Sequence, residues 1–522
     1  MDPRRPNDRR PARRPALGAA GALVLLAGCT TGAGAEDASP RGGADGSGTG
    51  LFDDAVVHDI EMSFDQDEYD AMIDAYVDSG SKEWITATVM IDGTTFEDVG
   101  LRLKGNSSLA GLAMSGSTGV TPEEGGKGTD GGGDEGTGGD VVVGRGGGPE
   151  SPGGSLSADD PESLPWLVRL DENVAGQSYE GISEFVVRSN DSETSLNEAV
   201  ALELIGLAGL ATQEAASASL SVNGNDEVLR LVVEHPDDTW DAANFDTEGV
   251  LYKAESTGDY SYRGEDPAAY EEVFEQETDK DQEDLAPLID FLDFINNSDD
   301  ATFAAELADH LDVDAFARYL AAQDLVANFD DIDGPGNNSY LRYDEETGAF
   351  TVVSWDLNLA FMGMGIVSKG DFGGGGGPGH EPPDGVDLSE DFVPPTDLPE
   401  GAQPPTEGTD LFGGGEPPAA GGHGGVIGAP NNVLVKRFMA DEGFAALYDQ
   451  ALAELAESLY DSGAADGILD RWAETLTAQA SDLVSAETIE EEAAALRTQF
   501  TSLADTPASS NGSSSNGPPP TT

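Results

Sequence analysis

The chain has 522 residues, of which 100 are acidic and 25 basic, and its formal net charge at pH 7 is −75. So large a negative charge repels the phosphates of nucleic acids and the headgroups of anionic lipids, and we expect neither as a direct partner. The chain has one cysteine, Cys29, so an intramolecular disulfide is excluded. The fold must therefore be stabilised by packing or by bound ions.

The N-terminal residues predict export and attachment to a membrane. Six arginines lie within residues 1–16, and the apolar run that follows at 16–27 is too short to span a bilayer comfortably. This run ends in Leu-Ala-Gly-Cys, which looks like a lipobox, a sequence in which Cys29 is acylated and the chain is cut before it. The alternative is an ordinary signal peptide with an incidental cysteine. We expect a lipoprotein signal peptide at 1–28, a tether at 29–50 and an extracytoplasmic protein held to the cell membrane only by its lipid anchor.

Three further stretches have compositions that do not favour folding. Residues 111–163 and 366–428 are rich in glycine, and the second is also rich in proline, while residues 506–522 are mostly Ser, Asn, Gly and Pro. Such segments bury too little apolar surface to offset the entropy lost on ordering. We therefore predict one monomeric domain at 51–505 with two disordered insertions, followed by a disordered tail.

The apolar periodicity of the remaining chain predicts both strands and helices. In chain order these are strands at 85–91 and 99–103 turned at 92–93, strands at 167–170 and 185–187, a helix at 195–207, a hairpin at 220–233, helices at 282–296, 300–308 and 312–327, a hairpin at 339–355, and helices throughout 431–503. Strands dominate the first part and helices the second. The pattern predicts an α+β fold.

Seven short motifs, in order along the chain, resemble those of the CotH (spore-coat protein H) family of atypical, metal-dependent protein kinases. They are VGLRLKGNSS at 99–108, SLNEA at 195–199, LVVE at 231–234, LYKA at 251–254, DVDAF at 312–316 with NFD at 328–330, NNSYL at 337–341, and WDLNLAF at 355–361. The resemblance implies a kinase-like bilobal fold. It also implies phosphorylation of Ser or Thr on an extracytoplasmic protein, using ATP and Mg²⁺ or another divalent metal.

Phosphoryl transfer needs positive charge on the nucleotide phosphates, and several residues in these motifs could supply or support it. Arg102 and Lys104 lie two apart on one strand and so share a face, where they could contact phosphates. Lys253 could also contact phosphates, and the sequence does not show whether Lys104 or Lys253 is the better candidate. Glu198 lies on the helix expected to pack behind this sheet, where it could pair with a lysine.

The same chemistry needs oxygen ligands for a divalent metal and a group that positions the hydroxyl nucleophile. Asp356 is the strongest candidate ligand, with Asn338 and Asn358 as further ligands, and Asp330 could orient the hydroxyl. Ordinary turn chemistry would also explain an Asp or Asn in these loops. Asn358 stands where the family pattern has an acid, which leaves a second hypothesis open: a catalytically inactive, lipid-anchored surface protein that binds a partner or a cell-envelope polymer.

Overall fold

The computed structural model describes residues 50–105, 109, 112, 156–255, 258–334, 338–361 and 432–504, all within the compact unit formed by residues 40–522. Cys29, the predicted signal peptide and tail, and most of both predicted insertions lie outside the described residues. Within the described residues, no helix is long and apolar enough to cross a membrane.

A closed barrel of seven strands forms the first part of the fold, in the order β1-β2-β3-β4-β5-β7-β6. The strands are β1 (Val57–Phe64), β2 (Ile85–Ile91), β3 (Thr94–Leu103), β4 (Trp166–Arg169), β5 (Glu184–Val187), β6 (Ala215–Val222) and β7 (Val228–Glu234). All neighbours are antiparallel except β1 and β6, whose parallel pairing closes the barrel. Apolar side chains fill its interior and continue under α1 (Gln66–Ser79).

The predicted hairpin between β2 and β3 is present, with its turn at the expected residues. Asp92 and Gly93 have φ values of 49° and 79°. Two successive left-handed residues are what a type I′ turn requires, and this turn matches the twist of paired strands. From this turn β3 runs to Leu103, so Arg102 and Lys104 lie at the opposite end of the strand from the turn.

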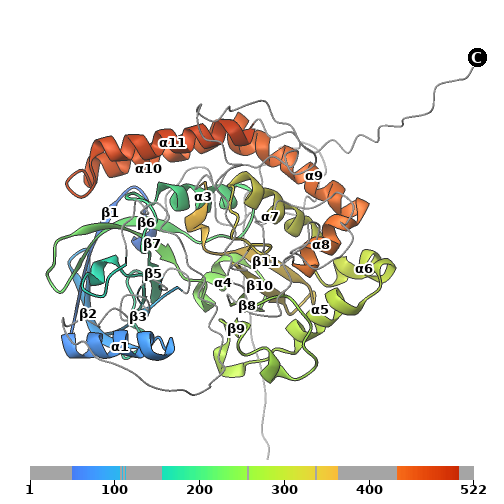
Figure 1. Ribbon diagram of the computed structural model, residues 1–522, viewed down its shortest axis with the longest axis horizontal. Helices are drawn as coiled ribbons and strands as arrows, with labels where there is room; N and C mark the ends of the chain where they lie inside the picture. The colour runs from blue at the N-terminus through green and yellow to red at the C-terminus, as the bar shows by residue number, and fades with distance from the viewer. Residues whose placement is uncertain are drawn as a thin grey trace, which may run out of the picture. The chain divides into compact units, whose positions relative to one another are not determined.

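A second sheet of four strands, in the order β11-β10-β8-β9, lies beside the barrel (Figure 1). Its strands are β8 (Gly249–Ala254), β9 (Phe274–Gln276), β10 (Ser339–Asp344) and β11 (Phe350–Ser354). One face packs into the large helical core through side chains such as Tyr252 and Leu341. The other face presents Tyr340 and Val353, which form a small apolar core with Leu167 and Val186 of the barrel. This small core defines a seam between barrel and second sheet.

Helices surround the second sheet and extend over the barrel. They are α3 (Leu196–Leu207), α4 (Asp238–Asn244), α5 (Ala286–Asn297), α6 (Asp300–Glu306), α7 (Val313–Leu325), α8 (Val433–Ala440), α9 (Glu442–Ala456), α10 (Ala464–Gln479) and α11 (Ala486–Ala504). Figure 1 shows α10 and α11, in red, along one side of the fold above α3, which both of them contact. The helix α3 is thus buried between the barrel and the C-terminal helices.

The fold is α+β, as the sequence predicted, and each predicted strand and helix is found within a few residues of its expected place. The predicted hairpin at 339–355 is present as β10 and β11, which join β8 and β9 in the second sheet. One expectation needs correction. The first insertion was drawn too long, because Leu156 and Ala158 pack on the barrel core and the Trp166 indole N–H donates to the Pro161 carbonyl over 2.9 Å.

Candidate active site

Basic side chains gather at the seam, on both of its sides. Arg102 lies on β3 and Lys104 directly follows it, while Lys253 lies on β8 and Lys82 in the segment that precedes β2. Burial, together with repulsion from Lys253 and Arg102, lowers the pKa of both Lys82 and Lys104 to about 8. This group, hereafter the basic cluster, would be stabilised by an anion placed among its members.

Lys104 lies deepest in the basic cluster. Its ammonium nitrogen is 2.9 Å from His235 Nε2 and 5.6 Å from the centre of the Trp355 ring. The other nitrogen of His235 lies 3.0 Å from Glu184 Oε1, although without the geometry of a hydrogen bond. Lys104 is therefore held in place by a histidine rather than neutralised by a carboxylate within the described residues.

Glutamates limit the positive charge of the basic cluster. Lys253 pairs with Glu255, and Lys280 lies 2.7 Å from Glu277 Oε2. Burial would raise the pKa of Glu277, but Lys104 and the neighbouring Lys280 and Lys253 outweigh burial and lower this pKa to about 2. Four of the five lysines in the described residues lie in or beside the basic cluster, in a chain with a net charge of −75. This concentration of lysine is the strongest electrostatic feature of the seam.

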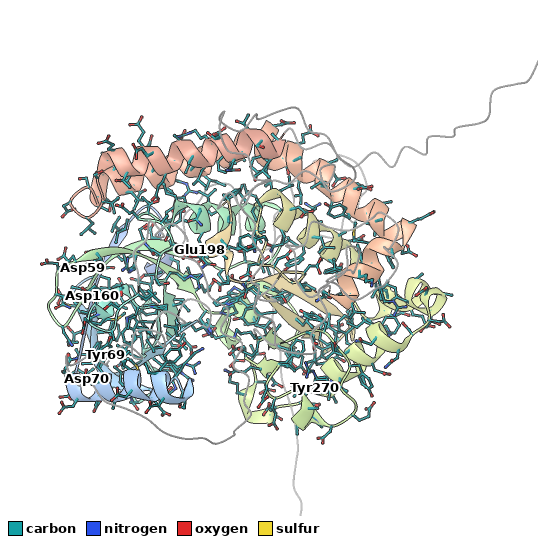
Figure 2. The ribbon with its side chains drawn as sticks, in the orientation of Figure 1. Asp59, Tyr69, Asp70, Asp160, Glu198 and Tyr270 are labelled. Carbon is teal, nitrogen blue, oxygen red and sulfur yellow. The ribbon has the colours of Figure 1, made fainter. Side chains whose placement is uncertain are left out.

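A second cluster, of opposite sign, surrounds Arg188 at the end of β5. The guanidinium lies 2.8 Å from Glu198 Oε1 on α3 and also contacts the carboxylate of Asp356. Asp191 lies beside this pair and accepts a hydrogen bond from the side-chain amide of Asn358 over 2.5 Å. In Figure 2, Glu198 lies in the middle of the drawn side chains, well away from Tyr69 and Asp70 on α1. We call Arg188, Asp191, Glu198, Asp356 and Asn358 the acidic cluster.

The acidic cluster has fewer positive charges than carboxylates. Burial and the nearby Asp356 carboxylate raise the pKa of Glu198 to about 7, despite the opposing effect of Arg188. Burial also raises the pKa of Asp191. The guanidinium of Arg188 is thus the one positive charge among the three carboxylates of the acidic cluster, and an added cation would reduce the repulsion between these carboxylates.

The backbone around the acidic cluster is unusual. Asn190, Ser195 and Asp356 all have positive φ values, of 42°, 53° and 60°. Non-glycine residues rarely adopt this conformation, and such strain gathers at functional sites. At Asp356 it turns the chain out of β11 and directs the carboxylate to Arg188, while the preceding Trp355 lies beside Lys104 of the basic cluster.

The loop between α7 and β10 brings two more predicted residues together. The side-chain amide of Asn338 donates to Asp330 Oδ2 over 2.8 Å. Asn328 in the same loop donates to Gln323, whose amide in turn donates to the Ser354 hydroxyl at the end of β11. The loop is thereby tied to the strand that leads into Asp356.

The predicted residues therefore fall into three neighbouring groups: Arg102, Lys104 and Lys253; Glu198, Asp356 and Asn358; and Asp330 with Asn338. One pairing differs from the expectation. Glu198 on α3 pairs with Arg188, which directly follows β5, and not with a lysine.

Sequence reasoning missed several residues of the site. Lys82, Arg188, Asp191 and His235 belong to no pattern that singled them out. The scarcity of lysine in so acidic a chain was a usable signal for Lys82. Arg188, which directly follows the buried strand Glu184–Val187, was a signal for a buried ion pair.

The oxygen ligands that a divalent metal would need are present in the acidic cluster, although they are not arranged as a complete cage. Among the described residues, no three His, Cys, Asp or Glu side chains are grouped so as to hold a metal ion. Mg²⁺ in nucleotide sites is commonly held by only one or two carboxylates, with phosphates and water completing its shell. Asp356, Asp191 and the Asn358 amide oxygen fit that donor set, and their shortage of positive charge favours a cation.

Comparison with known proteins gives the chain its family. The family model described as "CotH kinase protein" matches residues 153–498, about two thirds of the chain. The match includes β4 to β11 and most of α11 but begins after Arg102 and Lys104. The inner spore coat protein H of Bacillus subtilis (strain 168) is 26% identical over 191 residues, which are 35% of this chain. The aligned region spans about half, 52%, of that relative. The chain belongs to the CotH kinase protein family.

Proposed function

We propose that this protein is an atypical protein kinase that transfers phosphate from ATP to a Ser or Thr hydroxyl of an extracytoplasmic protein. One observation carries the proposal: two clusters of opposite charge meet at Trp355 and Asp356. Lys104 lies against the Trp355 ring, and Asp356 is the next residue along the chain. A metal–nucleotide complex has the complementary pattern, with phosphates for the lysines and a cation for the carboxylates.

Each cluster has its own part in the proposed reaction. Lys104, Lys253, Arg102 and Lys82 bind and orient the phosphates, and their positive charge stabilises the negative charge of the transferring group. Asp356, with Asn358 and Asp191, holds the divalent metal, which supplies further positive charge at the phosphates when bound. His235 keeps the Lys104 ammonium aimed into the seam.

The third group, Asp330 with Asn338, is proposed to act on the acceptor hydroxyl. The hydrogen bond from Asn338 fixes the Asp330 carboxylate. A carboxylate in that position orients the Ser or Thr hydroxyl and accepts its proton as the oxygen attacks phosphorus. Asn338 also offers an amide oxygen to a second metal.

The two parts of the fold on either side of this site can be compared with the two lobes of a kinase. In this proposal the barrel corresponds to the first lobe, and the second sheet with its helices to the second. The basic cluster draws residues from both sides of the seam, because β3 belongs to the barrel and β8 to the second sheet. Nucleotide bound there would contact both lobes at once.

A thermal-shift measurement tests the nucleotide site directly. Ligand that binds only the folded state raises the melting temperature. We expect ATP with Mg²⁺ to raise it more than either alone, because the two charge clusters are then satisfied together. The same melting temperature with and without Mg²⁺–ATP would contradict the proposed site.

A catalytically inactive binding protein is the second candidate, and one observation favours it. Asn358 replaces the acid of the family pattern, and its amide is engaged with Asp191. An inactive protein would keep the fold and its surface but show no metal-dependent binding of ATP. We also propose that the mature chain is lipid-anchored through Cys29, which would place either activity outside the cytoplasm.

A further inference from the structure

Tyr340 is the exception among the buried tyrosines of the described residues. Seven others hydrogen-bond through their hydroxyls; these are Tyr69, Tyr252, Tyr260, Tyr270, Tyr319, Tyr448 and Tyr460. The Tyr340 side chain is fully buried, with 0% exposed, and its hydroxyl has no hydrogen-bond partner within the described residues. Leaving a buried polar group unpaired is costly, so such a hydroxyl calls for an explanation.

The position of Tyr340 is fixed by the sheet. It lies on β10 directly opposite Lys253 of β8, and opposite residues of an antiparallel pair project to the same face. Its ring packs edge-on against Trp355, with 5.4 Å between ring centres. The side chain therefore projects from the second sheet into the seam, between the basic cluster and Asp356.

The hydroxyl of Tyr340 remains protonated in this environment. Burial, and then the carboxylates Glu277 and Glu255, raise its pKa well above 10. Asp356 contributes in the same direction, so the hydroxyl lies within the electrostatic reach of both clusters. None of these carboxylates accepts its hydrogen bond. The group is thus a pre-positioned donor that awaits an acceptor.

A second unpaired donor lies in the basic cluster, on Arg102. The Nε atom of Arg102 is also buried without a hydrogen-bond partner in the described residues, and its guanidinium lies 4.9 Å from the centre of the Trp84 ring. Arg102 comes from the barrel and Tyr340 from the second sheet, so the two sides of the seam each present a donor. Beside the lysines, the acceptor that fits is an anionic oxygen.

We infer that the Tyr340 hydroxyl donates a hydrogen bond to a phosphate oxygen of the ligand that binds the basic cluster. This inference rests on the proposed use of the seam as a phosphate site. It adds to that proposal a neutral, geometrically fixed donor, which selects a phosphate chain that reaches from the lysines towards Asp356. The Tyr340 hydroxyl acts in ligand binding in this account, whereas its ring belongs to the small apolar core of the seam.

The test compares two tyrosine-to-phenylalanine variants of the full chain. Tyr340→Phe removes the unpaired hydroxyl, whereas Tyr252→Phe removes a hydroxyl on the opposite face of the same sheet that donates to the Asp284 carbonyl over 2.7 Å. Calorimetry gives the Kd of inorganic tripolyphosphate, and thermal melting gives the stability without ligand. We expect Tyr340→Phe to bind tripolyphosphate about tenfold more weakly, equivalent to about 1.4 kcal/mol, with an unchanged or higher melting temperature.

Tyr252→Phe should give the opposite result, a lower melting temperature with an unchanged Kd. The inference is overturned if Tyr340→Phe binds tripolyphosphate as wild type does, if it loses stability as Tyr252→Phe does, or if the wild-type protein does not bind tripolyphosphate. Tripolyphosphate binding that depends on Tyr340, in a protein that transfers no phosphate from ATP, would support this inference while contradicting the proposed kinase function.

Discussion

Lys104 combines burial with crowding by other cations, and this gives phosphate binding a specific dependence on pH. The groups that face it are Lys253, Arg102, Glu277, Glu184 and His235. Burial and the two cations lower its pKa from 10.5 to about 8. The ammonium form, which binds phosphate, is therefore lost as the pH rises through about 8.

We predict that the affinity for tripolyphosphate falls between pH 7 and pH 9.5, measured by calorimetry. Lys104→Arg keeps its charge throughout this range and should show a smaller fall, with the remainder due to Lys82, whose pKa is also about 8. The stability of the ligand-free protein should respond in the other direction. Between about pH 8 and 10.5 the unfolded chain holds the proton that folded Lys104 has lost, so this residue contributes an increase in the free energy of unfolding as pH rises. A flat affinity profile in the wild-type protein would contradict this role for Lys104.

Asn358 offers a test of the proposed metal site, because its amide donates to Asp191. Asn358→Asp places two carboxylates together in a partly buried site. Without metal we predict a lower melting temperature than wild type, from like-charge repulsion. With Mg²⁺ the order should reverse, and the affinity for the metal should rise. A variant whose melting temperature is insensitive to Mg²⁺ would argue against a metal at Asp356 and Asn358.

At the scale of elements, local patterns in the sequence predicted most strands and helices. The alternation of buried residues in 85–91 and the Asp-Gly turn fixed the hairpin β2–β3, and the apolar spacing of Leu196, Val200 and Leu204 fixed α3. The strand β1 was missed because its alternating exposed positions include Asp59 and Glu61, which read as a polar surface. Its parallel pairing with β6 joins residues far apart in the chain, and no local pattern records such a pairing.

The candidate site was likewise predicted only in part. Residues were predicted where a family-like motif contained a side chain suited to phosphoryl transfer, as at Lys104 and Asp356. The charge partner of Glu198 could not be predicted, because no local pattern places Arg188, which follows β5, beside the side chain of Glu198 on α3. The charge balance of each cluster likewise depends on burial, which the sequence alone does not give.

The insertions provide a prediction at the scale of elements. The first is redrawn as 113–155, since residues 156–163 belong to the fold. Deleting 114–155 and 370–425, with short Gly/Ser linkers in their place, should change the melting temperature by only a few degrees, because loop closure entropy varies slowly with length. A control that removes 156–163 as well should destabilise the barrel. A large loss of stability from the first deletion would mean that an insertion packs on the domain.

At the scale of the whole molecule, charge and attachment govern where the protein acts. Cys29→Ser removes the predicted acylation site, and we expect the variant to move from the membrane fraction to the soluble fraction. A single acyl chain binds membranes only weakly, so stable attachment of the wild type requires more than one chain on the anchor. Cys29→Ala serves as a matched variant. Equal membrane partition of wild type and both variants would contradict a lipid anchor at this residue.

In the proposed function, the two charge clusters together bind a metal–nucleotide complex and transfer its phosphate. Asp356 belongs to one cluster and adjoins the other, so Asp356→Ala tests both. The buried pair of Asp241 with Arg342, 2.9 Å apart, provides a control, because Asp241→Ala removes a buried partner of Arg342 that belongs to neither cluster and leaves the guanidinium, within the described residues, with Asp344 alone as its ion-pair partner.

The measurement is transfer of label from γ-labelled ATP to protein, with Mg²⁺, alongside the melting temperature. We predict labelling by the wild type, loss of labelling in Asp356→Ala with melting nearly unchanged, and a lower melting temperature in Asp241→Ala with labelling retained by the folded fraction. A wild-type protein that labels nothing, with Asp356→Ala altering only stability, would contradict the kinase account and favour the binding-protein alternative.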